Sequence, residues 1–323
     1  TNGQKVGEAR DETLKSGRVG FDADEGMHLG FEIKPITKDR ATLKPGELVW
    51  KTSLGESYTN GGVSQGADGT IYVAAKQELV AVSPKDGTIL WRTPFEGEAR
   101  GGCLPVVADD GTLLLAVHGG KLHSFDGTSG KARWSFTFEE GGTFPESSPA
   151  VTADGNVYFG HKSAFCLNLA DGKQIWRTDF PNETSRTPPV IAANGTVVFT
   201  PGGAILAMHP LTGAILWQAR FPNFSLADPA VDGTTLYVNC SGGSTASGIK
   251  IGVLRAYDIT NGKLLWEHLT ENFSAANLAL DGRDRIFTRD MQGRVVACSA
   301  SSGARLWNAH EKAEPDGFTI GAD

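Results

Sequence analysis

The seven tryptophans of this 323-residue chain recur at a nearly constant interval, and no other feature restricts the fold as strongly. They are Trp50, Trp91, Trp134, Trp176, Trp217, Trp266 and Trp307. The intervals between them are 41, 43, 42, 41, 49 and 41 residues. A glycine stands four residues before each tryptophan, at Gly46, Gly87, Gly130, Gly172, Gly213, Gly262 and Gly303. Every tryptophan therefore belongs to one copy of a repeat of about 40 residues.

Each repeat contains four short β patterns. An Asx-Gly pair, which favours a tight hairpin because both residues tolerate positive φ, precedes each of the last six tryptophans. These pairs begin at Asp68, Asp110, Asp154, Asn194, Asp232 and Asp281. Residues 147–180 show the order, with SPAVTA, NVYFG, AFCLNL and KQIWRTDF alternating at period two around glycine turns. Four strands in about 40 residues predict an all-β fold, a β-propeller of four-stranded antiparallel blades, and exclude a helical repeat.

The repeats predict a single propeller domain over residues 16–323, after an N-terminal extension of residues 1–15. The clear copies run from residue 44 to residue 307. The tail GFTIGAD is similar to a first strand, DADEGMHLGFE is similar to a second, and ELVWKTS is a fourth. We therefore expect the two ends of the chain to complete one further blade, which gives seven blades and leaves no open sheet edge. Eight blades, with a degenerate N-terminal one, is the alternative.

An eleven-residue pattern surrounds each tryptophan. In the sixth copy, Ala256, Asp258, Gly262, Lys263 and Trp266 spell Ala-x-Asp-x-x-x-Gly-Lys-x-x-Trp. Other copies keep parts of it, with Ala81, Ala207 and Ala297 at the first position, Asp126 at the third, and Lys131 and Lys173 at the eighth; Arg40, Cys166 and Asn168 depart from it. The pattern resembles the tryptophan-docking motif of pyrroloquinoline-quinone-type propeller repeats. These occur in quinoprotein dehydrogenases and in the lipoprotein subunit of the outer-membrane β-barrel assembly machinery, and the chain resembles the latter more.

The tryptophans are expected to dock one blade against the next. An indole on an outer strand buries about 150–250 Å² and has one N–H to donate, and the nearby glycine permits close approach. In the quinoprotein enzymes that the repeat resembles, a tryptophan and a ring of adjacent cysteines enclose the quinone. Here every tryptophan is assigned to docking, and Cys103, Cys166, Cys240 and Cys298 are never adjacent. We therefore expect no cofactor, with pyrroloquinoline quinone and calcium both disfavoured, and we expect buried free thiols.

Charge and hydropathy exclude two classes of partner. The chain has 30 Lys+Arg against 37 Asp+Glu, a net charge of −7, so no basic excess exists to displace counterions from nucleic acid. No run of about 18 apolar residues is present to span a membrane. The chain begins at a threonine without a leader, so a membrane tether is expected only if the precursor is a lipoprotein. We expect a monomer, and the resemblance implies an extracytoplasmic location.

The long loops are the expected binding surface. Because the strands alternate in direction, the loops before each first strand and between the second and third strands share one face, the long-loop face. The Asx-Gly turns occupy the other, the turn face. About six residues after successive tryptophans, the first three loops carry glutamate and the next three carry asparagine: Glu56, Glu96, Glu98, Glu140, Asn182, Asn223 and Asn272. This acidic arc favours a basic peptide, a protein or a cation as ligand. Duplication of solvated loop residues is the alternative.

Other motifs are weaker. His118 and His161 end equivalent second strands and would supply half of a metal site, without an evident third ligand, so no metal site is predicted. The insertion CSGGSTASGIK at 240–250 predicts a mobile surface loop on the long-loop face. No nucleophile elbow, P-loop, zinc-protease or Cys-x-x-Cys motif is present. We therefore favour a non-catalytic binding or scaffold propeller with a protein or peptide partner. A quinoprotein-like enzyme, or a cofactor-binding propeller with its site over the central channel, is the alternative.

Overall fold

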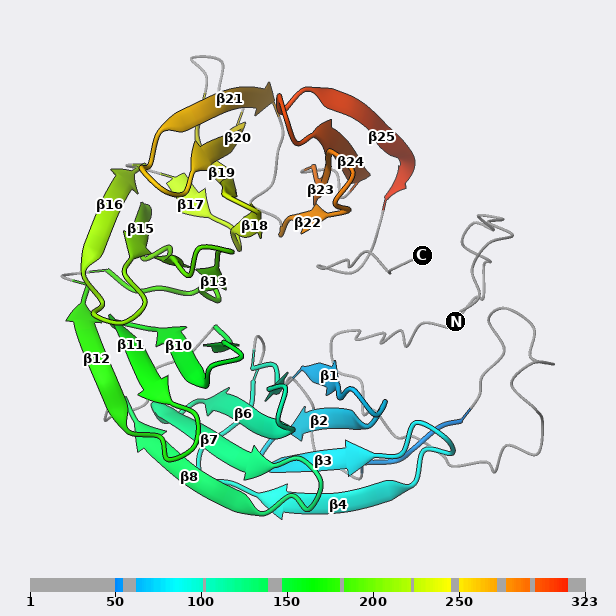
Figure 1. Ribbon diagram of the computed structural model, residues 1–323. Coiled ribbons are helices and arrows are strands. Elements are labelled where there is room, and N and C mark those ends of the chain that lie inside the picture. Colours follow the sequence, from blue (N-terminus) through cyan, green and yellow to red (C-terminus); the bar gives the residue numbers. More distant parts are fainter. Residues whose placement is uncertain are drawn as a thin grey trace.

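A computed structural model describes residues 50–54, 62–100, 103–138, 147–180, 183–221, 224–244, 250–271, 277–290 and 294–312. All regular secondary structure in these residues is β, and it forms six antiparallel sheets. The sheets follow one another around a common centre, with the first strand of each nearest the centre and the last on the rim (Figure 1). The expected β-propeller is confirmed. No helix in these ranges is long and apolar enough to cross a membrane.

Five of the six blades have four strands in sequence order. Blade 1 is β1 (Val63–Gln65), β2 (Ile71–Ala75), β3 (Glu78–Val82) and β4 (Ile89–Pro94). Blade 2 is β5 (Val106–Val107), β6 (Thr112–Val117), β7 (Lys121–Asp126) and β8 (Ala132–Thr137). Blade 3 is β9 (Ala150–Val151), β10 (Asn156–Gly160), β11 (Ser163–Asn168) and β12 (Gln174–Asp179). Blade 4 is β13 (Val190–Ile191), β14 (Val197–Phe199), β15 (Ala204–Met208) and β16 (Ile215–Arg220). Blade 6 is β22 (Ala279–Leu280), β23 (Arg285–Arg289), β24 (Arg294–Ser299) and β25 (Arg305–Lys312).

Blade 5 differs because its inner strand is split and its central hairpin is longer. It consists of β17 (Phe224–Leu226), β18 (Ala230–Asp232), β19 (Thr235–Ser244), β20 (Lys250–Asp258) and β21 (Leu264–Glu271). Both β17 and β18 pair with β19. The insertion at 240–250 was expected to form a loop, but β19 and β20 stay paired through Ser244 and Lys250. That expectation is wrong over the described part, because backbone pairing continues through its small residues. Residues 245–249 lie outside the described ranges.

The Asx-Gly pairs form the hairpin turns that the sequence predicts. Their glycines have φ between +57° and +87°, a region that favours glycine. Several Asx side chains also accept the N–H two residues later, as Asp110 does from Thr112 at 2.9 Å and Asn194 from Thr196 at 3.0 Å. These turns set the register of the first and second strands of each blade.

The hydrophobic core lies between blades rather than within them. Along β2, Tyr72 and Ala74 pack into a cluster with Leu113 of blade 2, whereas Ile71 and Val73 pack on the opposite side with Trp50. The same sharing recurs around the ring, because successive side chains of a strand point to opposite faces. A blade therefore depends on its neighbours for burial, as expected of a repeat protein.

The described residues contain six blades, together with Trp50–Leu54 packed against blade 1. Apart from residues 50–54, the predicted seventh blade, its eight-blade alternative and the N-terminal extension of residues 1–15 fall outside the described ranges.

Candidate functional site

Six of the seven tryptophans dock on the following blade. In each case the indole Nε1–H donates to the backbone carbonyl three residues before the repeat glycine of that blade. The acceptors are Pro84, Gly127, Leu169, Pro210, Ile259 and Ala300, at 3.2, 3.1, 2.8, 2.7, 2.6 and 3.0 Å from Trp50, Trp91, Trp134, Trp176, Trp217 and Trp266 in turn. The bond that satisfies the indole thus also joins two blades.

The repeat glycines form the surface on which the indoles pack. Gly87, Gly130, Gly172, Gly213, Gly262 and Gly303 have φ between +68° and +75°. A Cβ added at any of them would lie 2.5–2.7 Å from an indole atom of the preceding blade. Each glycine therefore serves the tryptophan of the blade before it, and not the tryptophan four residues later in its own strand.

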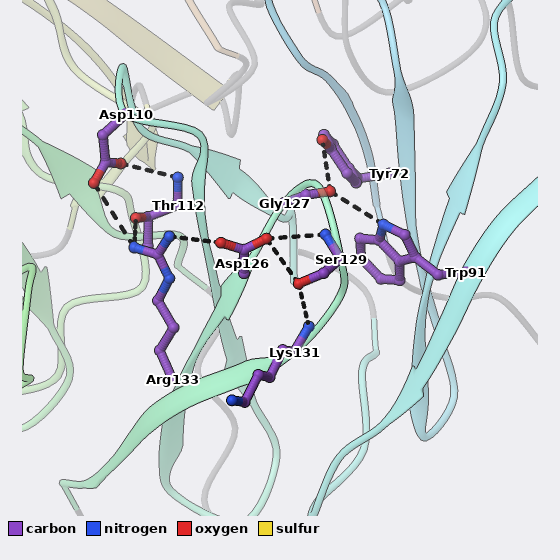
Figure 2. A network of polar contacts seen from close by, with 9 residues as sticks. All are labelled: Tyr72, Trp91, Asp110, Thr112, Asp126, Gly127, Ser129, Lys131 and Arg133. Carbon is purple, nitrogen blue, oxygen red and sulfur yellow. Dashed lines mark hydrogen bonds and ion pairs between the residues drawn. The ribbon is translucent and has the colours of Figure 1, made fainter.

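Figure 2 shows one of these joints, between blades 1 and 2. The carbonyl of Gly127 accepts both the Trp91 indole N–H at 3.1 Å and the Tyr72 hydroxyl at 3.2 Å. The Asp126 carboxylate holds the turn by accepting from the Ser129 N–H at 2.9 Å and from the Arg133 guanidinium at 2.8 Å. The Arg133 hydrogen bond, together with those from Ser129, lowers the pKa of Asp126 far below its usual range. Asp126, at the third motif position, therefore stabilises the turn on which Trp91 docks.

The first motif position lies across from the tryptophan in the same sheet. Ala81, Ser124, Cys166, Ala207, Ala256 and Ala297 pair with Trp91, Trp134, Trp176, Trp217, Trp266 and Trp307. All six are buried, so only a small side chain fits beside the indole. Asn168, which departs from the motif, still accepts the Ala170 N–H at 2.8 Å as Asp258 does from Thr260. The docked tryptophans are thus packing residues throughout.

On the long-loop face, a second set of aromatic residues joins the blades. A phenylalanine four residues after the tryptophan donates its backbone N–H to the turn between the second and third strands of its own blade. Its ring lies 5.2–6.3 Å from a ring of the next blade. These residues are Phe95, Phe138, Phe180 and Phe221. Sequence analysis missed them, although the spacing Trp-x-x-x-Phe is visible in four copies.

This anchoring fixes the loop that carries Glu96 and Glu98. The loop lies between the turns that join the second and third strands of blades 1 and 2. The backbone N–H of Ala99 donates to the Lys76 carbonyl of blade 1 at 2.8 Å, and the backbone N–H of His118 of blade 2 donates to the Glu98 carbonyl at 2.9 Å. The Glu96 carbonyl also lies 2.8 Å from His123 Nε2. Burial lowers the pKa of His123 below its usual value.

Both glutamates are ion-paired. Glu96 pairs with Lys121, and the hydrogen bond from that ammonium lowers the pKa of the Glu96 carboxyl. Glu98 pairs with Arg100 at 2.6 Å and with Lys76 at 3.7 Å, and the Arg100 hydrogen bond lowers its pKa. This part of the acidic arc thus holds three cations beside two carboxylates.

The remaining members of the predicted arc, Glu56, Glu140, Asn182, Asn223 and Asn272, lie outside the described residues. A further carboxylate that the prediction missed stands close by in sequence. Glu183, seven residues after Trp176 as Glu98 is after Trp91, pairs with Arg220 of blade 4 at 2.5 Å. Counting seven residues rather than six after the tryptophan would have found it.

The two histidines considered as metal ligands occupy equivalent turns of blades 2 and 3. His118 is backbone-paired with Glu98, and His161 is buried with its ring 5.9 Å from that of Phe138. Within the described ranges, no group of three or more His, Cys, Asp or Glu residues is arranged to hold a metal ion. The expectation that the protein has no metal site therefore remains a prediction from the sequence.

The four cysteines are buried free thiols, as expected. Burial raises the pKa of Cys166, Cys240 and Cys298 to about 11 and also raises that of Cys103. Since the thiolate is the reactive form, these thiols are inert in the folded protein. We expect an aromatic disulfide reagent at pH 8 to titrate none of them in the native state and all four in denaturant. Fast labelling of a native thiol would contradict this burial.

The fold and these joints define a class, a β-propeller in which tryptophans dock one blade on the next. The family model of outer membrane protein assembly factor BamB matches residues 40–165 and 160–319. The chain therefore belongs to this family.

Curated relatives support the same family. BamB of Nitrosomonas eutropha is 32% identical over 184 residues, which are 55% of this chain and 43% of the relative. BamB of Yersinia pestis is 25% identical over 218 residues, 60% of this chain and 54% of the relative. The chain spans about half the length of the curated relatives it matches. The resemblance to the assembly-machinery subunit is confirmed, and relatives named for the outer membrane agree with an extracytoplasmic location.

Two crystal structures share the fold. BamB from Moraxella catarrhalis has a TM-score of 0.64 at 16% identity, covering 82% of this chain and 80% of that one. Quinohemoprotein alcohol dehydrogenase from Comamonas testosteroni has a TM-score of 0.59 at 16% identity, and the match covers 78% of this chain and 59% of that one. At such identities the likeness concerns the fold alone.

In the described part of the chain, six tryptophans and the four cysteines hold positions that leave none of them available to enclose a quinone in the way the resemblance implies for the enzymes. Six tryptophans are docked on glycines and bonded to carbonyls of the next blade. The four cysteines are buried in separate blades, so no adjacent pair can form a ring over a cofactor.

Proposed function

We propose that this protein is a non-catalytic scaffold of outer-membrane protein assembly that binds a protein partner through its long-loop face. The observation that carries the proposal is the match of the BamB family model to two stretches that together span residues 40–319. The curated relatives carry the name of an assembly factor, which supports the same role here.

The geometry supports a binding role for the long-loop face. Backbone hydrogen bonds and the phenylalanine anchors attach the described parts of its loops to the blades, and loops held on a scaffold are where binding residues are usually presented. The described part of the acidic arc is a mixed-charge cluster, so the arc acts as an acidic surface only if Glu56 and Glu140 add to Glu96 and Glu98. Charges at the edge of an interface mainly set the association rate and its salt dependence.

The test is a pull-down of purified barrel-assembly machinery by the immobilised chain at matched ionic strength. We expect a variant with Glu56, Glu96, Glu98 and Glu140 all changed to Gln to bind about tenfold more weakly. Lys121→Gln with Arg100→Gln should bind at least as tightly as wild type. The control on the turn face is Asp86→Asn, which keeps the acceptor for the Thr88 N–H and should bind normally.

Two outcomes separate the parts of this proposal. Equal binding by all three variants would remove the acidic arc as the contact surface. Failure of the wild-type chain to retain the machinery would remove the assembly role itself. A titration with pyrroloquinoline quinone and calcium addresses the enzyme alternative, and we expect neither a spectral change nor a rise in melting temperature. The monomeric state and a lipid tether on the precursor remain predictions.

A further inference from the structure

Asp228 lies at a break in the inner strand of blade 5. This is the one described blade whose inner strand is divided, into β17 and β18, and residues 227–229 lie between the two parts. The backbone still follows β19 there, because the Ala227 N–H donates to the Asn239 carbonyl at 3.0 Å. The first strands lie nearest the centre of the ring, and the loops that lead into them are on the long-loop face (Figure 1). The half-buried Asp228 is therefore placed near the centre of the ring, towards the long-loop face.

The environment of the Asp228 carboxylate is unfavourable for a charge. Within the part of the chain that the structure describes, no hydrogen bond or ion pair reaches this carboxylate. Burial raises its pKa above the usual value. Asp258 shows the opposite, because hydrogen bonds from Thr260 lower its pKa. A carboxylate that is taken partly out of water without a donor costs stability, so we expect Asp228 to destabilise the free protein at neutral pH.

Strand pairing identifies the residues of the other blades that are equivalent to Asp228. Asp228 stands two residues before the strand residue that pairs with Tyr237. Ser148 has the same place in blade 3, two residues before the partner of Tyr158. Both tyrosines lie across from the first motif position of their own blades, so the two registers match. We call this the entry position, and in blades 1, 2, 4 and 6 it is occupied by Gly62, Leu104, Pro188 and Asn277.

At two described joints, the side chain at the entry position contacts the entry position of the preceding blade. The Leu104 side chain fills the space that a Cβ on Gly62 would need. The Ser148 hydroxyl accepts the Leu104 N–H at 3.3 Å and donates to the Leu104 carbonyl at 3.4 Å. By the same register, Pro188 is for Asp228 what Leu104 is for Ser148, and proline has no N–H. The backbone donor that serves Ser148 therefore has no counterpart for Asp228.

We propose that Asp228 accepts a lysine or arginine side chain of the protein partner that docks on the long-loop face. The inference rests on the proposed function, which supplies that partner. A basic side chain offsets the cost of the half-buried carboxylate, because it brings the opposite charge and the N–H donors that the described residues do not provide. A metal ion is a poorer occupant, because no group of three or more His, Cys, Asp or Glu in the described ranges is arranged to hold one.

The test measures the rates at which purified barrel-assembly machinery binds to and leaves the immobilised chain. Because a desolvated charge pair mainly sets the dissociation rate, Asp228→Asn should raise that rate about tenfold and leave the association rate within about twofold of wild type. The matched control is Asp232→Asn, at the exposed end of β18 in the Asx-Gly turn. It removes the same charge from the same inner strand, keeps a turn of the type found at Asn194, and should change neither rate.

The stability of the free protein separates recognition from a structural role. We expect Asp228→Asn not to lower the urea midpoint at pH 7, because it removes a charge that the described chain leaves unpaired. A lower midpoint would show that Asp228 is paired within the chain, and it would overturn the proposal.

The binding outcomes distinguish this inference from the proposed function. A wild-type dissociation rate for Asp228→Asn would overturn the contact and leave the assembly role intact. Equally faster dissociation of Asp228→Asn and Asp232→Asn would reduce the effect to net charge and would also overturn the contact. If the wild-type chain did not bind the machinery at all, the assembly role would fail, and this contact would fail with it.

Discussion

Replacing Trp176 by alanine is expected to lower the free energy of unfolding by about 3–5 kcal/mol, the cost typical of emptying a buried aromatic site. Trp176 is buried between blades 3 and 4, where its ring lies on Gly213 and its N–H bonds to Pro210 at 2.7 Å. The substitution removes the packing and the indole hydrogen bond, and the Pro210 carbonyl keeps its hydrogen bond from the Tyr158 hydroxyl at 3.3 Å. Urea unfolding followed by circular dichroism measures the change as a lower midpoint.

The matched control is Ile175→Ala on the same strand. The Ile175 side chain is 48% exposed, so its truncation should change stability by less than about 0.5 kcal/mol. Similar losses in the two variants would mean that the outer strand contributes through its backbone alone, and not through the docked indole.

Gly172→Ala should be the second most damaging change. The added Cβ would lie 2.6 Å from the Trp134 ring, and the residue would have to keep φ at +70°. The left-handed conformation costs a non-glycine residue about 1–2 kcal/mol, and forcing the indole aside adds about 1–3 kcal/mol. Chemical denaturation should therefore show a loss of about 2–5 kcal/mol.

Gly155→Ala separates the two causes. Gly155 has φ of +82°, but a Cβ there would meet nothing closer than Leu169 at 3.9 Å. It should therefore show the backbone cost alone, about 1–2 kcal/mol. If Gly155→Ala proved as costly as Gly172→Ala, close approach of the indole would not be the reason for glycine in the docking turn.

The fold could be predicted from the sequence because its decisive signals are local and repeated. The Asx-Gly turns and the tryptophan spacing each fall within one blade, so they can be counted without knowing which blades are neighbours. The docking partners could not be found in this way. Trp134 packs on Gly172, 38 residues later, and the acceptor at Leu169 is a backbone carbonyl that any residue provides.

The candidate site was less predictable because its ion pairs join residues of different blades. The loop sequence after Trp91 shows Glu96 and Glu98 but not Lys121, which comes from the third strand of the next blade. Counting along the loops therefore overstated the acidity of this part of the face. The phenylalanine anchors were visible as a spacing, yet their role depends on rings in the following blade, such as Phe159 beside Phe138.

We propose that this propeller serves outer-membrane protein assembly by binding a partner rather than by catalysis, and this role can be tested in cells. The most direct measurement is the amount of folded β-barrel protein in the outer membrane of a strain of the source bacterium that lacks the gene. We expect a reduced amount, restored by the wild-type gene and by Asp86→Asn but not by the variant with Gln at positions 56, 96, 98 and 140. An unchanged amount in the strain without the gene would contradict the claim.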